Sequence, residues 1–298
     1  MRAISPQEVR VTQPHTTDNE QQIQTDQPSR SWLKRALISV VAVGGVAYVA
    51  AAGYMYLNQR SLLFKPSGVL PEPQAVGLAD ATVLKVPMSD GVELTTWSVP
   101  ASAEGAPTVL FFHGQSGNLG DRVQRLEEIV DSGFGLLAPS YRGYPGSPGE
   151  PSEQALISDG VELFDLLETQ GETVILHGQS LGTGIATAVA EQRPEAELLV
   201  LEAPFTATVD VAAERYPWLP VSALMKDHFA TRDLIDDVEV PILIFHGSED
   251  ETVPPHHSKK LAELSGAKAQ LFMIPGGTHN DLWSHGLWQE VRQNLPAN

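Results

Sequence analysis

The distribution of apolar residues divides the chain into three regions. Residues 1–33 are rich in Gln, Thr, Asp and Pro and have almost no apolar periodicity, which predicts a disordered tail. The region 34–58 contains an uncharged apolar run, Ala36 to Leu57. In the region 59–298, short apolar runs alternate with amphipathic segments, a pattern typical of a mostly parallel sheet flanked by helices. The pattern therefore predicts a tail, one apolar helix and one α/β domain.

The apolar run is long enough to cross a membrane. Its 22 residues, at about 1.5 Å rise each, span the roughly 30 Å hydrocarbon core of a bilayer. Trp32 precedes the run, and Tyr54 and Tyr56 lie at its far end, where interfacial aromatic residues are expected. A cleaved signal peptide is the alternative, because Ala50 and Ala52 form a small-x-small pattern. The run is longer than a usual signal core and lies far from the chain start, which favours an uncleaved anchor.

Basic residues beside the run predict its orientation. Three precede it and two follow it, namely Arg30, Lys34 and Arg35, then Arg60 and Lys65. Since basic residues favour the cytoplasmic side, we expect a single-pass protein with its N-terminus inside. The remainder of the chain would then be extracytoplasmic, and periplasmic in a Gram-negative bacterium.

Eight apolar segments of the third region predict strands. The first two, 81–88 and 92–99, flank Ser89-Asp90-Gly91, a hairpin turn signal. The others are short and continuously apolar, as in strands buried on both faces. They occupy 108–114, 134–140, 173–178, 197–204, 241–247 and 269–276. Helices are expected between them, and 205–238, after the sixth strand, is expected to form a small cap of one or two helices.

Composition excludes several kinds of chemistry. The chain has no cysteine, so thiol nucleophiles, disulfides and thiolate metal sites are absent. Its formal net charge of −18 argues against nucleic acid, because phosphate binding requires a basic surface. His256 and His257 look like metal ligands, but neighbouring residues on a helix do not face one ligand. No metal and no cofactor is therefore expected.

Three predicted strands end in His-Gly, at His113, His177 and His246. Because ligands of open α/β sheets bind outside the carboxyl ends of the strands, we expect the three following loops to form parts of one site. The histidines themselves, at the strand ends, are expected to be structural residues whose polar atoms are satisfied.

The middle loop contains the candidate nucleophile, Ser180, in the G-x-S-x-G segment 178–182. The segment lies between a strand and a helix, where a serine is held in a strained backbone and the two glycines remove side chains that would collide. The helix N-terminus favours developing negative charge. Ser116 and Ser248 lack this pattern.

A serine nucleophile needs a base and an orienting acid. In this strand–turn–helix context the chain order is Ser, acid, His, and Asp250 and His279 follow two later strands in that order. Glu249 and Glu251 are alternatives for the acid. The oxyanion hole requires two backbone N–H groups, which are expected from Leu181 and from the loop of the first His-Gly, at Gln115 or Ser116. In the cap, the candidate walls of an acyl pocket are Tyr216, Trp218 and Phe229, although these aromatic residues could instead pack the cap onto the domain.

From Gln59 onward the sequence resembles the α/β-hydrolase superfamily, and more narrowly its single-pass membrane-anchored proteins. The resemblance rests on QRSLLFKP, HGQSGNLGDR, YRGYPGSPG, GQSLGT, YPWLPVSALMKDHF, HGSEDETVP and GGTHND, in that order. It implies an α/β-hydrolase fold with a mostly parallel eight-stranded sheet flanked by helices. It also implies catalytic roles for Ser180, Asp250 and His279 and oxyanion roles for Gln115 and Leu181. Some eukaryotic relatives remove palmitoyl groups from proteins, which suggests thioesters.

The expected function is therefore a serine esterase or thioesterase that acts through an acyl-enzyme on Ser180. Small-molecule or lipid-like acyl compounds are the expected substrates, because the chain is anchored beside lipids. A peptidase or amidase with the same triad is the alternative within enzymes. A membrane-tethered scaffold that keeps the fold without chemistry is the alternative outside them, and the oligomeric state is left open.

Overall fold

The computed structural model describes residues 30–296, so most of the predicted tail lies outside the described residues. The chain separates into two units, Met1–Ala50 and Ala51–Asn298. The described part of the first unit belongs to helix α1 (Arg30–Leu63), which continues into the second unit. The segment Ser31–Leu63 is long and apolar enough to cross a membrane, with a mean hydropathy of 2.0 and no burial in its most apolar stretch. The helix is longer than the predicted 34–58 at both ends.

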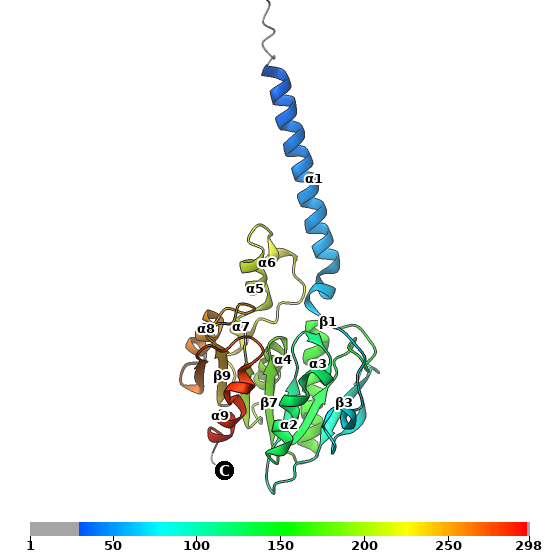
Figure 1. Ribbon diagram of the computed structural model, residues 1–298, viewed down its shortest axis with the longest axis vertical. Helices are drawn as coiled ribbons and strands as arrows, with labels where there is room; N and C mark the ends of the chain where they lie inside the picture. Colours follow the sequence, from blue (N-terminus) through cyan, green and yellow to red (C-terminus); the bar gives the residue numbers. More distant parts are fainter. Residues whose placement is uncertain (1–29, 297–298) are drawn as a thin grey trace, which may run out of the picture. The chain divides into compact units, whose positions relative to one another are not determined.

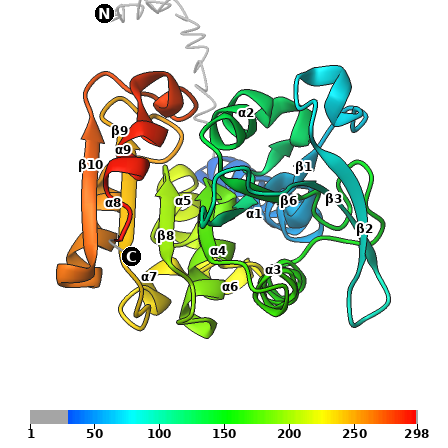
Figure 2. The ribbon, with the colours of Figure 1, turned by 90° about the horizontal axis from the view of Figure 1, so that it is seen from below.

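The second unit is built on an eight-stranded sheet, as predicted. The strand order is β10-β9-β8-β7-β4-β6-β3-β2, from orange to cyan in Figure 2. Neighbouring strands are parallel except at β3, which is antiparallel to both β2 and β6. The strands are β2 (Thr82–Pro87), β3 (Glu93–Val99), β4 (Thr108–Phe112), β6 (Gly135–Pro139), β7 (Val174–Gln179), β8 (Leu198–Glu202), β9 (Ile242–Gly247) and β10 (Ala269–Ile274).

Helices cover both faces of the sheet because its central strands are apolar on both sides. In β4, Val109 and Phe111 belong to one core cluster, and Leu110 and Phe112 belong to the other, as the two-residue period of a strand requires. The first cluster includes side chains of α2 (Val123–Asp131) and α9 (Leu287–Gln293). The second includes side chains of α3 (Glu153–Thr169), α4 (Leu181–Gln192) and α8 (His256–Ser265). Helices lie between the parallel strands along the chain, as the sequence predicted.

A small cap follows β8, the sixth strand of the sheet, as predicted. It contains three short helices rather than one or two: α5 (Thr208–Arg215), α6 (Val221–Leu224) and α7 (Thr231–Leu234). Figure 1 shows α5 and α6 beyond one end of the strands. Their apolar residues form a small core of their own with the end of α1, at Ala52 and Met55.

The last turns of α1 are bound to the cap by polar contacts within the second unit. The Gln59 side chain donates to the Leu224 carbonyl at 3.2 Å and accepts from the Lys226 amide at 2.7 Å. Arg60 pairs with Asp227 at 3.0 Å. These contacts give a physical reason for α1 to continue through Leu63, beyond the predicted apolar segment.

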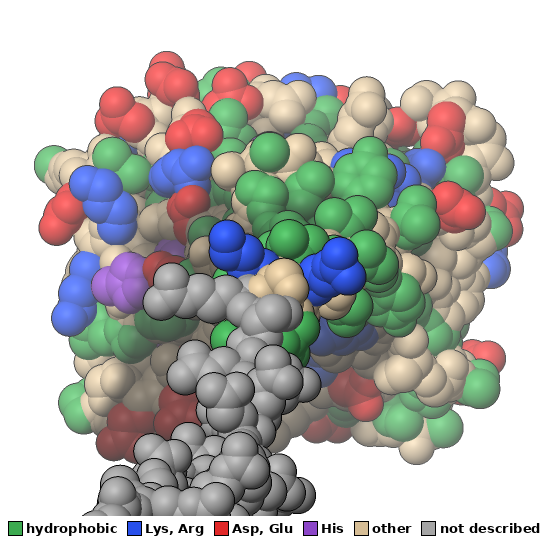
Figure 3. Space-filling view, turned by 90° about the horizontal axis from the view of Figure 1, so that it is seen from above, with side chains coloured by type: hydrophobic (Ala, Val, Ile, Leu, Met, Phe, Trp, Pro, Cys, Tyr) green, Lys and Arg blue, Asp and Glu red, His purple; other side chains and the backbone are tan. Residues whose placement is uncertain are grey.

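Acidic side chains are visible at several places on one face of the second unit (Figure 3). On the face in Figure 3 they lie scattered toward the rim rather than gathered in one patch. This distribution agrees with the net charge of −18 acting as a solvated surface rather than as a defined binding site.

Candidate active site

Ser180 occupies a strained turn between β7 and α4. Its backbone has φ 49° and ψ −114°, in the positive-φ region that residues other than glycine avoid. A Cβ at Gly178 would lie 2.5 Å from the Gly182 carbonyl oxygen, and a Cβ at Gly182 would lie 2.0 Å from the Phe112 carbonyl oxygen. Both glycines of G-x-S-x-G are therefore required by close backbone approach, and the turn raises Ser180 above the N-terminus of α4.

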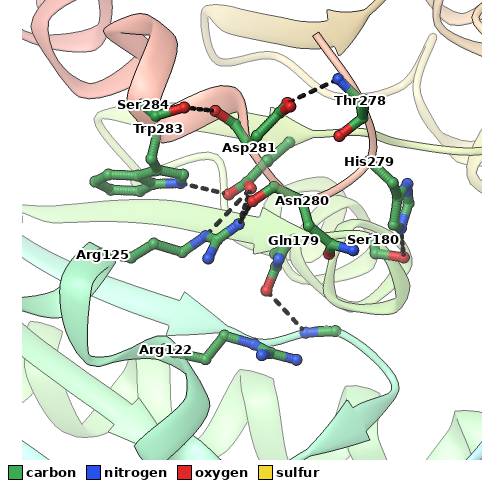
Figure 4. A network of polar contacts seen from close by, with 12 residues as sticks. Arg122, Arg125, Gln179, Ser180, Thr278, His279, Asn280, Asp281, Trp283 and Ser284 are labelled. Carbon is green, nitrogen blue, oxygen red and sulfur yellow. Dashed lines mark hydrogen bonds and ion pairs between the residues drawn. The ribbon is translucent and has the colours of Figure 1, made fainter. Parts of the chain in front are cut away.

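The structure brings Ser180, His279 and Asp250 together. Ser180 Oγ lies 3.0 Å from His279 Nε2, and His279 Nδ1 lies 2.7 Å from Asp250 Oδ2. Since a carboxylate only accepts, His279 Nδ1 is the donor to Asp250, which leaves Nε2 to accept the Ser180 hydroxyl proton. Figure 4 shows His279 pointing at Ser180 from the loop after β10.

The side chain of Asp250 is fixed by four contacts. Its Oδ1 accepts the backbone amides of Thr252 and Val253 at 2.8 and 2.9 Å, and its Oδ2 contacts His279 and, at 3.2 Å, His246 Nε2. Burial raises the pKa of Asp250, but the hydrogen bonds from His246 and His279 outweigh it and hold the pKa well below its usual range. Asp250 is therefore ionised at neutral pH. The strand-end residue His246 has both ring nitrogens satisfied, as expected, since Nδ1 contacts Ser258 Oγ and Nε2 lies 2.8 Å from the Val253 carbonyl, and it also contacts the Asp250 carboxylate.

The predicted oxyanion residues also meet at Ser180. Gln115 and Leu181 line the same cavity as Ser180, whereas Ser116 is not among its lining residues. His113 Nδ1 lies 2.7 Å from the Gly114 carbonyl, so the imidazole donates to that oxygen and orients the peptide that carries the Gln115 N–H. In a trans peptide this N–H points away from the carbonyl, and therefore away from buried His113.

Two of the strand-end histidines are less fully paired than expected. His113 and His177 are completely buried, yet His113 Nε2 and both ring nitrogens of His177 lack a hydrogen-bond partner. Burial lowers the pKa of His113 to about 3 and also lowers the pKa of His177. Both imidazoles are therefore neutral near pH 7, which excludes them as cationic groups in the site.

A cavity of about 480 Å³ opens at Ser180. Of the three predicted wall residues, Tyr216 lines it, whereas Trp218 and Phe229 do not. Phe229 is buried against Gly184, and Trp218 is half exposed. One wall of the cavity, which the sequence did not predict, is formed by residues of the last turns of α1, namely Met55, Tyr56, Gln59, Leu62 and Leu63.

Comparison with known proteins identifies the family. A family model described as "Serine aminopeptidase, S33" matches residues 103–234. An esterase from Pyrococcus furiosus has the same fold, with a TM-score of 0.61, 15% identity, and coverage of 77% of this chain and 96% of that one. An uncharacterized protein of Mycobacterium tuberculosis is 36% identical over 258 residues, which cover 84% of this chain and 90% of the relative. The chain belongs to the α/β-hydrolase superfamily.

Among other α/β-hydrolases, lysophosphatidylserine lipase ABHD12 from Xenopus tropicalis is 28% identical over 196 residues. These residues cover 59% of this chain and 51% of the lipase.

This α/β-hydrolase also contains a buried ion pair, between Arg125 and Glu202, that contacts the loop with His279. Glu202 is fully buried, with Arg125 Nη2 at 2.9 Å from its Oε1 and Trp283 Nε1 at 2.7 Å from its Oε2. Arg125 Nη2 also donates to the Asn280 carbonyl at 2.9 Å, next to His279. Burial raises the pKa of Glu202, but the charge and hydrogen bonds of Arg125 outweigh it and hold the pKa at about 2. Figure 4 shows this network beside Ser180.

A second polar cluster lies where the cap meets α8. The rings of His256 and His257 stack, with centroids 4.3 Å apart, and both Nε2 atoms face the carboxylate of Glu214. Contrary to the expectation from their spacing, these two neighbouring residues face one carboxylate, because they lie in the first turn of α8 and both rings turn toward Glu214 of α5.

Proposed function

We propose that the protein is a serine hydrolase that cleaves carboxylic ester or thioester bonds through an acyl-enzyme on Ser180. The observation that carries the proposal is the continuous hydrogen-bonded chain Ser180–His279–Asp250, with contacts of 3.0 and 2.7 Å. The serine at the end of these hydrogen bonds lies in a strained turn and lines a cavity.

The geometry supports a definite proton path. His279 Nε2 removes the proton of Ser180 Oγ as the oxygen attacks the acyl carbon, and later returns it to the leaving group. The ionised Asp250 stabilises the imidazolium that forms. The Gln115 and Leu181 amides would stabilise the oxyanion, and water would then hydrolyse the acyl-enzyme by the reverse proton path.

We propose that the acyl chain of the substrate lies in the cavity between the cap and the last turns of α1. The wall is largely apolar, and Met55, Leu62 and Leu63 contribute to it. The same helix continues toward the N-terminus as a segment long enough to cross a membrane. We therefore propose an uncleaved single-pass anchor with the N-terminus inside, an extracytoplasmic catalytic unit, and a lipid-like acyl substrate.

Hydrolysis of p-nitrophenyl esters from C2 to C16 by the full chain in detergent tests the proposal, with Ser180→Ala as the matched variant. We expect turnover that the variant loses almost entirely. Labelling by a fluorophosphonate probe, present in the wild type and absent in Ser180→Ala, reports on the nucleophile independently of the ester used. Turnover that survives in Ser180→Ala would refute the acyl-enzyme.

A peptidase or amidase is the second candidate, favoured by the match to the serine aminopeptidase family model. Labelling of Ser180 together with amide but no ester hydrolysis would favour it. Absence of both labelling and hydrolysis would leave the non-catalytic scaffold.

A further inference from the structure

The cluster of Glu214, His256 and His257 has the geometry of a metal-binding site. Glu214 Oε1 lies 2.9 Å from His256 Nε2 and 3.6 Å from His257 Nε2, and the ligand atoms of all three residues lie within 4.8 Å of one another. Two donors about 2.0 Å from one tetrahedral ion are about 3.3 Å apart. The two distances at Glu214 lie on either side of that separation, so small side-chain rotations would bring the donors into place.

A second observation points to a ligand at this position. The His257 side chain is only 2% exposed, and its Nε2 atom has no hydrogen-bond partner although it faces the carboxylate. A buried polar atom without a partner is costly, by about 1–3 kcal/mol.

We propose that Glu214, His256 and His257 bind a divalent transition-metal ion, and that zinc is the ion the site selects. Two imidazole nitrogens and one carboxylate oxygen are a typical three-residue zinc set, which water completes to four ligands. Calcium and magnesium prefer sites made of oxygen ligands, so the two histidines disfavour them.

The residues behind His257 support this assignment. The Thr206 amide donates to His257 Nδ1 at 3.3 Å, Thr206 Oγ1 lies 2.8 Å from the same Nδ1, and Thr206 Oγ1 donates to Asp210 Oδ2 at 2.6 Å. Metal binding at Nε2 would move the ring proton to Nδ1, where Thr206 Oγ1 can accept it in place of the contact with the amide. The hydroxyl and the carboxylate behind it then form the hydrogen-bonded support that metal-binding histidines usually have.

The ion would connect two elements that border the catalytic cavity. Glu214 belongs to α5, whose Ala212 and Arg215 line the cavity, and His256 begins α8, just after the lining residue Val253. A metal bridge would therefore hold one cavity wall against the domain and stabilise the cap.

Metal binding to the full chain in detergent, purified without a polyhistidine tag and stripped with EDTA, tests the proposal. After equilibrium dialysis against zinc, we expect one zinc per chain by mass spectrometry of the metal, and a melting temperature that rises with zinc concentration. Cobalt should give the visible absorption of a tetrahedral ion. The exposed ligands provide the variants: His256→Ala and Glu214→Gln should each weaken zinc binding by about tenfold or more.

His285→Ala is the matched control, because His285 is an exposed histidine beside Asp281 outside the cluster. It should bind zinc as the wild type does. Substoichiometric zinc in the wild type, or equal binding by the wild type and His256→Ala, would overturn the proposal.

Discussion

Replacing Glu202 with glutamine isolates the charge of the buried carboxylate that supports the histidine loop. Glu202 is fully buried and the Arg125 side chain is only 11% exposed, so solvent screens their interaction weakly. Removing one partner of a buried pair costs about 3–5 kcal/mol, because the other charge stays buried without compensation. Glutamine keeps the shape and part of the hydrogen bonding, so we expect a loss of about 3 kcal/mol. A domain of this size loses about 2–4 °C per kcal/mol, which corresponds to about 6–12 °C in melting temperature.

The same substitution should lower activity, since Arg125 also binds the Asn280 carbonyl beside His279. Misplacement of a catalytic group by about 1 Å costs on the order of 100-fold, so we expect kcat to fall at least about tenfold with KM little changed. Ester hydrolysis and thermal unfolding of the full chain in the same detergent measure both effects. Glu104→Gln, an exposed loop carboxylate, is the control and should change neither.

The free energy of unfolding, measured as the pH is lowered, tests whether the ionised carboxylate of Glu202 stabilises the protein. The pKa of Glu202 lies below its ordinary value of 4.5, at about 2, so its stabilisation is present above pH 4.5 and is lost as pH falls toward 2. The difference between wild type and Glu202→Gln should therefore shrink in that range. The double variant Glu202→Leu with Arg125→Met should be more stable than Glu202→Leu alone. A Glu202→Gln protein within about 0.5 kcal/mol of the wild type at pH 7 would refute the reasoning.

Three further predictions follow from the turn at Ser180, the cavity and the buried histidines. Gly182→Ala should abolish probe labelling of Ser180 or prevent folding, because the new Cβ would lie 2.0 Å from the Phe112 carbonyl oxygen; unchanged labelling would contradict the close approach. Leu62→Trp should reduce turnover of C12–C16 esters at least about tenfold while C2–C4 esters are affected less than about threefold. The larger side chain narrows the cavity wall on α1, and Leu62 makes no contact in the chain Ser180–His279–Asp250. An unaltered chain-length profile would place the acyl chain elsewhere. The free energy of unfolding should fall as pH drops from 6.5 toward 3. The reason is that the pKa of buried His113 is lowered to about 3, so the unfolded chain binds the proton at a higher pH than the folded chain. His113→Phe should reduce the slope of unfolding free energy against pH by up to about 1.4 kcal/mol per pH unit.

Local rules explain why the sequence alone predicted the strands and the three residues that meet at Ser180. The continuous apolar runs matched strands that are buried on both faces. The G-x-S-x-G segment matched the turn at Ser180, because the close approach of backbone atoms at Gly178 and Gly182 leaves no room for a Cβ and is local to that turn. Asp250 and His279 were predicted from chain order and strand ends, since parallel strands deliver their loops to one edge of the sheet.

Tertiary structure decided which side chains from distant segments meet. The cavity wall at Leu62, the pairing of Arg125 with Glu202 across 77 residues, and the burial of Phe229 away from the cavity all depend on how elements pack. No period or spacing in the chain encodes these contacts. The same holds for His256 and His257, whose residue spacing argued against a shared ligand until the packing of α8 against α5 turned both rings toward Glu214. Sequence determined the elements and the order of the candidate catalytic residues, because propensity and turn chemistry act over a few residues. Packing determined the cavity wall and the polar clusters, because these arise only where separate elements are pressed together.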